Sequence, residues 1–151
     1  MLMTCVNISN FGSSGLEENH HLLASVNLSN YWNITDICLP ALIRSCPLLS
    51  HVDLLGCSND NDMGVSALIR SCPLLSHVDL LGCSNDTDMG VSALGRSCPL
   101  LSGIILYNCV KIADISVSTI LITCRHLRLL QCDIYSGTSF ALRRDYSHLQ
   151  I

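Results

Sequence analysis

The chain contains the stretch Ser45-Cys46-Pro47-Leu48-Leu49-Ser50-His51-Val52-Asp53-Leu54-Leu55-Gly56-Cys57, and residues 71–83 repeat it without change. The duplication continues to residue 96, and the copies at 45–70 and 71–96 differ only at Asn61/Thr87 and Ile69/Gly95. A fixed period of 26 residues is typical of a stacked-repeat protein, in which each unit buries its apolar face against its neighbours. Such an architecture favours a binding surface over a catalytic pocket.

The same period continues on both sides of the duplicated copies. Apolar triplets recur at Leu23/Val26/Leu28, Leu49/Val52/Leu54, Leu75/Val78/Leu80, Leu101/Ile104/Leu106 and Leu127/Leu130/Cys132. We therefore expect one domain spanning residues 1–151, with repeat units at 20–45, 46–71, 72–97, 98–123 and 124–149. Residues 1–19 are expected to be a partial repeat, in which Cys5 takes the position of Cys57.

Each unit carries a strand signal followed by a helix signal. In Val52-Asp53-Leu54 the two apolar side chains face one side of a strand and the aspartate faces the other. A helix is predicted from Asp62 to Arg70, because Asp is a good N-cap and the apolar residues share one face; Asp88 repeats the cap. We therefore predict an α/β solenoid shaped like a horseshoe, with parallel strands on the concave face and helices on the convex face.

The repeat resembles the cysteine-containing leucine-rich repeat family, whose pattern is Cys-x-x-Leu-x-x-Leu-x-Leu-x-x-Cys-x-x-Ile-Thr-Asp-x-Gly-Leu-x-x-Leu. Residues 31–39 and 57–68 are close to it, and in-register copies cover nearly the whole chain. The chain is thus similar to the repeat region of F-box proteins. In those proteins the repeats bind a target, while a separate F-box recruits the SCF ubiquitin-ligase scaffold. No F-box pattern occurs in these residues, so a scaffold partner is expected only if an F-box lies upstream of Met1.

Composition and charge narrow the classes of partner and compartment. The net charge of −4 is spread without runs, whereas nucleic-acid binding requires a clustered basic face. The sequence contains no run of ~18 apolar residues that would predict a membrane span, and its N-terminus does not resemble a secretory signal. We expect neither nucleic acid nor membrane as partner, and a cytoplasmic or nuclear location. An extracellular receptor fragment is an alternative, because glycosylation sequons stand at Asn7, Asn27, Asn33 and Asn85.

The ten cysteines are predicted to be reduced core residues. Zinc sites use pairs such as Cys-x-x-Cys, and the sequence contains none. Cysteines that recur at one position per unit, as Cys46, Cys72, Cys98 and Cys124 do, are typical of a ladder of small buried side chains. Neighbouring rungs would lie ~5 Å apart, so disulfides are geometrically allowed as an alternative. No cofactor and no metal are expected.

Strand residues that point away from the leucine core should line the concave face in three columns. These columns are Ser25, His51, His77, Gly103, Leu129; then Asn27, Asp53, Asp79, Ile105, Gln131; then Ser29, Leu55, Leu81, Tyr107, Asp133. Polar groups mixed with aliphatic and aromatic anchors favour a protein-binding strip. We predict that a protein substrate or peptide binds at Asn27, His51, Asp53, Leu55, His77, Asp79, Leu81, Ile105, Tyr107 and Gln131. An exposed sheet face that binds nothing is the alternative.

His51 with Asp53, and the copied pair His77 with Asp79, also invite an acid–base interpretation. We expect both pairs to lie on an open surface without a nearby nucleophile, so we do not expect the protein to be an enzyme. A pH-sensitive contact through the histidines is a second alternative. The sequence therefore predicts a recognition module, the substrate-binding part of an F-box-type ubiquitin ligase, with a stand-alone repeat scaffold or inhibitor as the alternative.

Two aspartates and one glycine depart from the repeat pattern. Asp60 and Asp86 occupy a slot that holds Ile34 and Ile112 in the flanking units. Because a lone buried carboxylate is costly, we expect both to turn toward water. A sharper hypothesis is a weak Ca²⁺ site formed by Asp60, Asp62, Asp86 and Asp88.

Gly95 replaces Ile69 near the end of a helix. The loss of a core side chain and the added backbone freedom predict a soft helix at 88–96. On this basis, changing Gly95 to isoleucine should raise the melting temperature.

Overall fold

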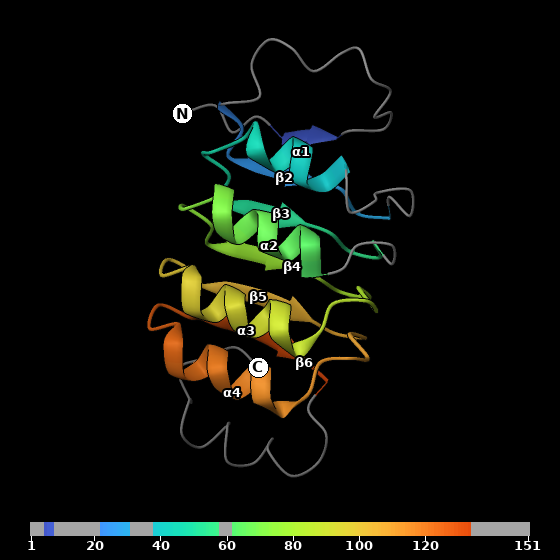
Figure 1. The fold of residues 1–151 in the computed structure, drawn as a ribbon, viewed down its shortest axis with the longest axis vertical. Coiled ribbons are helices and arrows are strands. Elements are labelled where there is room, and N and C mark those ends of the chain that lie inside the picture. The colour runs from blue at the N-terminus through green and yellow to red at the C-terminus, as the bar shows by residue number, and fades with distance from the viewer. Residues whose placement is uncertain (1–4, 8–21, 31–37, 58–61, 134–151) are drawn as a thin grey trace.

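The computed structural model describes residues 5–7, 22–30, 38–57 and 62–133. Its elements alternate along the chain, with strands on one side and helices on the other (Figure 1). The strands are β1 (Cys5–Asn7), β2 (Ser25–Asn27), β3 (His51–Asp53), β4 (His77–Asp79), β5 (Gly103–Leu106) and β6 (Leu129–Cys132). The helices are α1 (Cys38–Arg44), α2 (Asp62–Ser71), α3 (Asp88–Ser97) and α4 (Asp114–Thr123). No helix in the described ranges is long and apolar enough to cross a bilayer.

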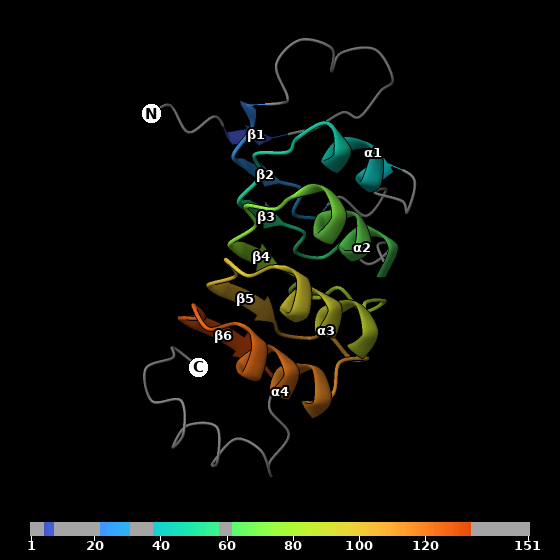
Figure 2. The ribbon, with the colours of Figure 1, turned by 60° about the vertical axis from the view of Figure 1, so that its left-hand side comes forward.

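The strands form one parallel sheet in the order β1-β2-β3-β4-β5-β6, and α1 to α4 stack beside one another in a second layer (Figure 2). From β2 onward the register joins residues 26 apart, so that Val26, Val52, Val78, Ile104 and Leu130 form one continuous row. In the described central units, residues 72–76 connect α2 to β4, and residues 80–87 connect β4 to α3. The predicted α/β solenoid and its stacking period are confirmed.

The first strand differs from the expected register. β1 pairs with β2 through Val6 and Val26, which are 20 residues apart, so Cys5 lies within a strand and not at the position of Cys57. The sequence carried a signal for this pairing, because Val6-Asn7-Ile8-Ser9-Asn10 and Val26-Asn27-Leu28-Ser29-Asn30 differ at one position only. A search restricted to the 26-residue period misses it.

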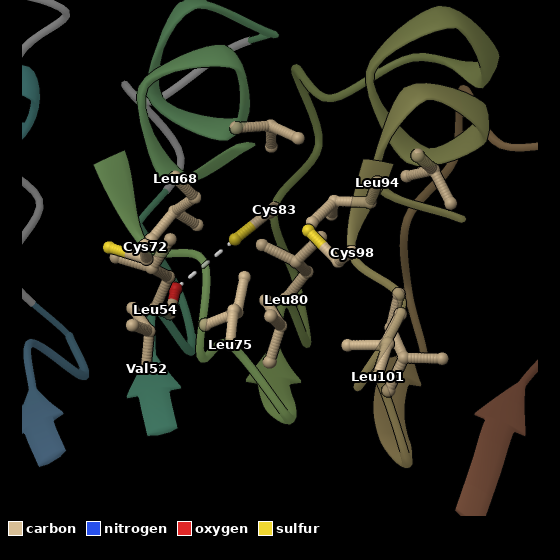
Figure 3. Close-up of a cluster of buried hydrophobic side chains, with 14 of the residues drawn as sticks. Val52, Leu54, Leu68, Cys72, Leu75, Leu80, Cys83, Leu94, Cys98 and Leu101 are labelled. Carbon is tan, nitrogen blue, oxygen red and sulfur yellow. Dashed lines mark hydrogen bonds between the residues drawn. The ribbon is translucent and has the colours of Figure 1, made fainter. Parts of the chain in front are cut away.

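The core is a spine of leucine, valine and cysteine between the two layers (Figure 3). Leu54, Leu80 and Leu106 are equivalent residues of successive repeats and are fully or almost fully buried. Leu68 and Leu94 contribute from the helices and are fully buried. At roughly 25 cal/mol per Å² of apolar surface, each such side chain stabilises the fold by about 2 kcal/mol. Because every unit buries its rungs against the next, stability depends on the neighbours of each unit.

Eight described cysteines are buried, reduced members of this spine. Five of them donate their thiol proton to a carbonyl oxygen of the preceding repeat. The three shortest bonds run from Cys57 to Leu28 (3.1 Å), from Cys83 to Leu54 (3.1 Å) and from Cys109 to Leu80 (2.9 Å). Figure 3 shows the second of these bonds. The ladder thus pairs buried carbonyl groups as well as filling space.

The buried thiols are expected to react slowly. Burial raises the pKa of Cys72 and of Cys109 to about 12, and the thiolate is the reactive form. At pH 8 we expect native Cys72 and Cys109 to be alkylated at least about 100-fold more slowly than in guanidinium chloride, because their thiolate fraction is so small. Peptide mass spectrometry after timed labelling gives each rate. Equal native and denatured rates would show that these rungs are open to solvent.

The helix starts lie one residue away from the expected caps. Thr87, and not Asp88, is the N-cap of α3, and its hydroxyl oxygen accepts a hydrogen bond from the Met89 N–H. The aspartates at the first helical position reach the next unit instead. Asp62 accepts hydrogen bonds from the N–H (2.8 Å) and hydroxyl (2.5 Å) of Thr87.

The bridge from Asp88 repeats this arrangement one unit further on. Its carboxylate accepts hydrogen bonds from the Ala113 N–H (2.8 Å) and from the Ser116 hydroxyl. Each aspartate thus binds the otherwise unpaired N–H groups at the start of the following helix, where negative charge is favoured.

Asp86 is the clearest departure from expectation. We expected it to face water, but its side chain is 0% exposed and neither carboxylate oxygen has a hydrogen-bond partner within the described ranges. Burial, with a smaller effect of the Asp62 charge, raises its pKa to about 7. The carboxyl group therefore avoids the cost of a buried charge by protonation and not by exposure. Asp60 lies outside the described residues.

Gly95 also has a different role from the expected one. It is buried, and a Cβ atom at this position would lie 2.9 Å from Thr123 Oγ1 and 3.3 Å from the Ile120 Cα. The absent side chain allows α3 and α4 to approach closely. These contacts reverse our expectation for isoleucine at this position, because the space that its side chain needs is already occupied.

Candidate binding face on the parallel sheet

The strand side chains that point away from the helices form an open groove of about 450 Å³. The groove crosses the strands, so that neighbouring units contribute equivalent residues to it. Its lining residues are Ser25, Val26, Asn27, His51, Val52, Asp53, His77, Val78, Asp79, Gly103, Ile105 and Leu129. The β2–β4 part is polar, whereas the β5–β6 part presents Ile105 and Leu129.

Two stacked histidines occupy the middle of this groove. The rings of His51 and His77 lie parallel within 6°, and their centroids are 4.4 Å apart. The hydroxyl of Ser50 donates to the Ala24 carbonyl oxygen (3.0 Å) and lies 2.8 Å from His51 Nδ1, which orients the imidazole ring.

The second histidine repeats the arrangement. Ser76 donates to the Ser50 carbonyl oxygen (3.0 Å) and contacts His77 Nδ1 at 3.0 Å. Burial, and then the nearby charge that His51 can carry, lowers the pKa of His77. The ring lies directly over Gly103, where any side chain would overlap it. His77 therefore packs between the His51 ring and the Gly103 backbone.

The next column of the groove is acidic. Asp53 Oδ1 accepts a hydrogen bond from the Leu55 N–H (3.0 Å), and Asp79 Oδ1 accepts one from the Leu81 N–H (2.9 Å). Burial and the Asp53 charge raise the pKa of Asp79, while the Leu81 bond opposes that rise. Within the described ranges neither histidine hydrogen-bonds to an aspartate, so the geometry adds nothing to the acid–base interpretation.

The structure brings six of the ten predicted contact residues together in the groove, namely Asn27, His51, Asp53, His77, Asp79 and Ile105. The other four, Leu55, Leu81, Tyr107 and Gln131, are not among its lining residues. Gln131 lies in β6, and the remaining three follow the strand positions of their units. There the chain turns through Gly56 and Gly82, whose φ angles are 72° and 75°. This turn moves the third column out of the groove.

Three lining residues were in the expected columns but not among the predicted contacts: Ser25, Gly103 and Leu129. Alternation along each strand was enough to find them. Gly103 offers no side chain for a partner, but it provides the space that the His77 ring occupies.

The hypothetical Ca²⁺ site gains no support. Asp62 and Asp88 already accept hydrogen bonds from the next helix, and Asp86 is buried and unpaired. No cluster of three or more metal-ligating side chains occurs within the described part of the chain. Asp60 lies outside it.

These features define a leucine-rich-repeat solenoid with an open sheet face, and solved structures agree with that class. Yeast Rad7, in its complex with Elc1, matches 77% of this chain at 18% identity with a TM-score of 0.64. The chain spans 29% of that Rad7 chain. The tropomodulin C-terminal domain from Caenorhabditis elegans matches 83% of this chain and 85% of its own length, at 19% identity and a TM-score of 0.59. No protein-family profile and no curated protein matches the chain.

Proposed function

We propose that the groove binds a segment of a partner protein. The observation that carries this proposal is the groove itself, in which six predicted residues from adjacent strands share one open surface. Its aspartates can accept hydrogen bonds and its histidines can form them, while Ile105 and Leu129 supply apolar contacts. Interfaces commonly combine apolar anchors with a polar surround. A rigid parallel sheet holds these groups in place before binding, which reduces the entropy lost on association.

The chemistry of the groove suggests the character of its partner. Asp53 and Asp79 favour basic or other donor groups over the β3–β4 part. The β5–β6 part favours aliphatic or aromatic side chains. We therefore propose a segment that is basic or rich in donors at one end and apolar at the other.

The proposed biological context is substrate recognition for an F-box-type, SCF-dependent ubiquitin ligase. The resemblance to cysteine-containing leucine-rich repeats supports this context, and one structural neighbour was crystallised together with a second protein. A stand-alone repeat scaffold or inhibitor, with no link to a ligase, is the second candidate. Both candidates use the same groove, so they differ only in what else the protein is joined to.

Substitutions in the groove should weaken binding of the partner protein. We expect the triple variant Asp53→Asn, Asp79→Asn, Ile105→Ser to weaken partner binding at least about tenfold, because it removes two charges and one anchor. Asparagine retains an Oδ1 acceptor for the backbone N–H groups, so folding should be preserved. Quantitative mass spectrometry of proteins crosslinked to the chain in cells identifies the partner, and titration of the purified partner gives the affinity.

Two controls define the outcome. Met89→Ser changes an exposed side chain on α3 and should leave the same partners bound. Tyr107→Ala tests the turn beside the groove and should have a smaller effect than the triple variant. A partner that binds all three variants equally would place the interface away from the groove.

The ligase context has a separate test. Sequencing of full-length transcripts should find an F-box coding segment joined in frame, and the bound partner should persist longer after the chain is depleted. Partner binding without an F-box segment and without a change in partner lifetime would support the scaffold or inhibitor.

A further inference from the structure

The two edges of the solenoid carry opposite charges. All five described arginines lie where helices end or where loops lead into strands: Arg44, Arg70, Arg96, Arg125 and Arg128. In Figure 1 these are the loops on the left-hand side. The described aspartates lie at the opposite edge, where strands end and helices begin: Asp53, Asp62, Asp79, Asp86, Asp88, Asp114 and Asp133. The one described lysine, Lys111, is at that acidic edge and donates to Asn85.

The helix dipole explains only part of this arrangement. Arg44, Arg70 and Arg96 lie in the last turns of α1, α2 and α3, where a cation is favoured. Arg125 and Arg128 follow α4 and lie in the loop before β6. All five side chains are exposed, and they extend the basic edge along the ends of α1, α2, α3 and α4.

A ladder of exposed leucines accompanies the arginines. It consists of Leu22, Leu48, Leu74 and Leu100, whose exposed fractions run from 42% to 59%. Three of them follow exposed prolines in these loops. Packing does not require leucine here, because the last unit has the exposed residue His126 in the same column. Single exposed leucines are ordinary, but a row of four along one edge indicates a contact surface.

We propose that this arginine–leucine edge is a second docking surface, which binds a protein segment that carries Asp or Glu beside aliphatic or aromatic side chains. Charge complementarity selects the occupant, because the edge has five cations while the described carboxylates lie on the opposite side. The leucines are about half covered by their own loops, so they form a shallow floor for apolar side chains and not protruding anchors. This edge is separate from the groove on the sheet face, and the proposal does not depend on the proposed function.

A designed peptide tests the edge directly on the full chain. The probe is a fluorescent 12-residue peptide that combines Asp and Glu with Leu and Phe, and binding is followed by anisotropy at 50 and 300 mM salt. One control peptide has Lys in place of the acids, and the other has Ser in place of the apolar residues. We expect the probe to bind at least about tenfold more tightly than either control, and more weakly at high salt.

Three variants locate the binding. The double variant Arg70→Glu, Arg96→Glu should weaken binding of the probe peptide at least about tenfold. The double variant Leu74→His, Leu100→His should have the same effect at pH 8; histidine is chosen because the last unit already has it at this position. Arg70→Gln with Arg96→Gln is the milder charge variant, and thermal melting confirms that each one folds. The groove triple variant should bind the probe normally.

Three outcomes would overturn the proposal. The first is equal binding of the probe and its controls. The second is loss of binding in the groove variant but not in the edge variants. The third is that the edge prefers another ligand to the probe, either phosphatidylserine vesicles or a second copy of the chain, the latter detected by light scattering.

Discussion

Replacing Asp86 by isoleucine is expected to raise the free energy of unfolding at pH 8 by about 4 kcal/mol. The Asp86 carboxyl is fully buried and unpaired, and its pKa is raised from 3.8 to about 7. At about 1.4 kcal/mol per pKa unit, its ionisation in the folded state costs about 4 kcal/mol above pH 7. The equivalent residue of the next unit, Ile112, packs against the core, which shows that the fold accepts isoleucine at this position.

The same carboxyl makes stability depend on pH. A pKa raised by folding means that the folded state holds the proton more tightly than the unfolded state. The stabilising effect is complete below pH 4 and is lost as the pH rises through about 7. The Asp86 contribution should therefore be about 3 kcal/mol less favourable at pH 8 than at pH 5. His77, whose pKa is lowered, contributes in the opposite direction.

Matched variants isolate the Asp86 contribution. Asp86→Asn keeps the size but removes the charge, so its stability relative to wild type should increase between pH 5 and pH 8. Ile112→Asp places a carboxyl at the equivalent position of the next unit, which is only partly buried, and should introduce a weaker pH dependence of the same sign together with a loss of stability. Urea unfolding at both pH values measures all three variants. Identical pH profiles for wild type and Asp86→Asn would mean that the carboxyl is not buried.

Changing Gly95 to isoleucine is expected to lower the free energy of unfolding by about 2 kcal/mol or more. A Cβ atom at Gly95 would lie 2.9 Å from Thr123 Oγ1 and 3.2 Å from Ile120 Cγ1. Thr123 is held in place, because its hydroxyl donates to the Thr119 carbonyl oxygen (2.7 Å). The new side chain must therefore push α3 and α4 apart.

Gly95→Ala distinguishes the two effects at this position, because helix propensity and steric crowding predict opposite changes in stability. Alanine should stabilise a free helix by about 1 kcal/mol relative to glycine, whereas crowding predicts a lower melting temperature. The swap Ile69→Gly with Gly95→Ile conserves composition and should also be less stable than wild type. If the swapped variant melts at the wild-type temperature, the two helix positions are equivalent, and the close approach of α4 to Gly95 does not limit stability.

Much of the fold was predictable because the repeat period specifies which residues stack on one another. The 26-residue period correctly placed the residues of β3 beside those of β4, and alternation along each strand placed His51 and Asp53 on the open face. The first strand was misplaced, because its pairing follows a 20-residue spacing that the dominant period conceals.

The groove on the sheet face was only partly predictable. Leu81 and Tyr107 have the correct column spacing, but the chain turns at Gly82 immediately after the strand position. Alternation holds only while the backbone remains extended, so it cannot show where a column leaves the groove. The edge leucines were part of the repeat from the start, but their exposure became evident only with the loops in place.

The period, the buried row of leucine, valine and cysteine, and the open side of the sheet all follow from the order of the amino acids. They do so because burial of one face per unit is a local pattern repeated in register. The burial of Asp86 and the close approach of α4 to Gly95 could not be predicted in this way. Both depend on how closely a neighbouring unit approaches, and that distance is set by the side chains of two units together.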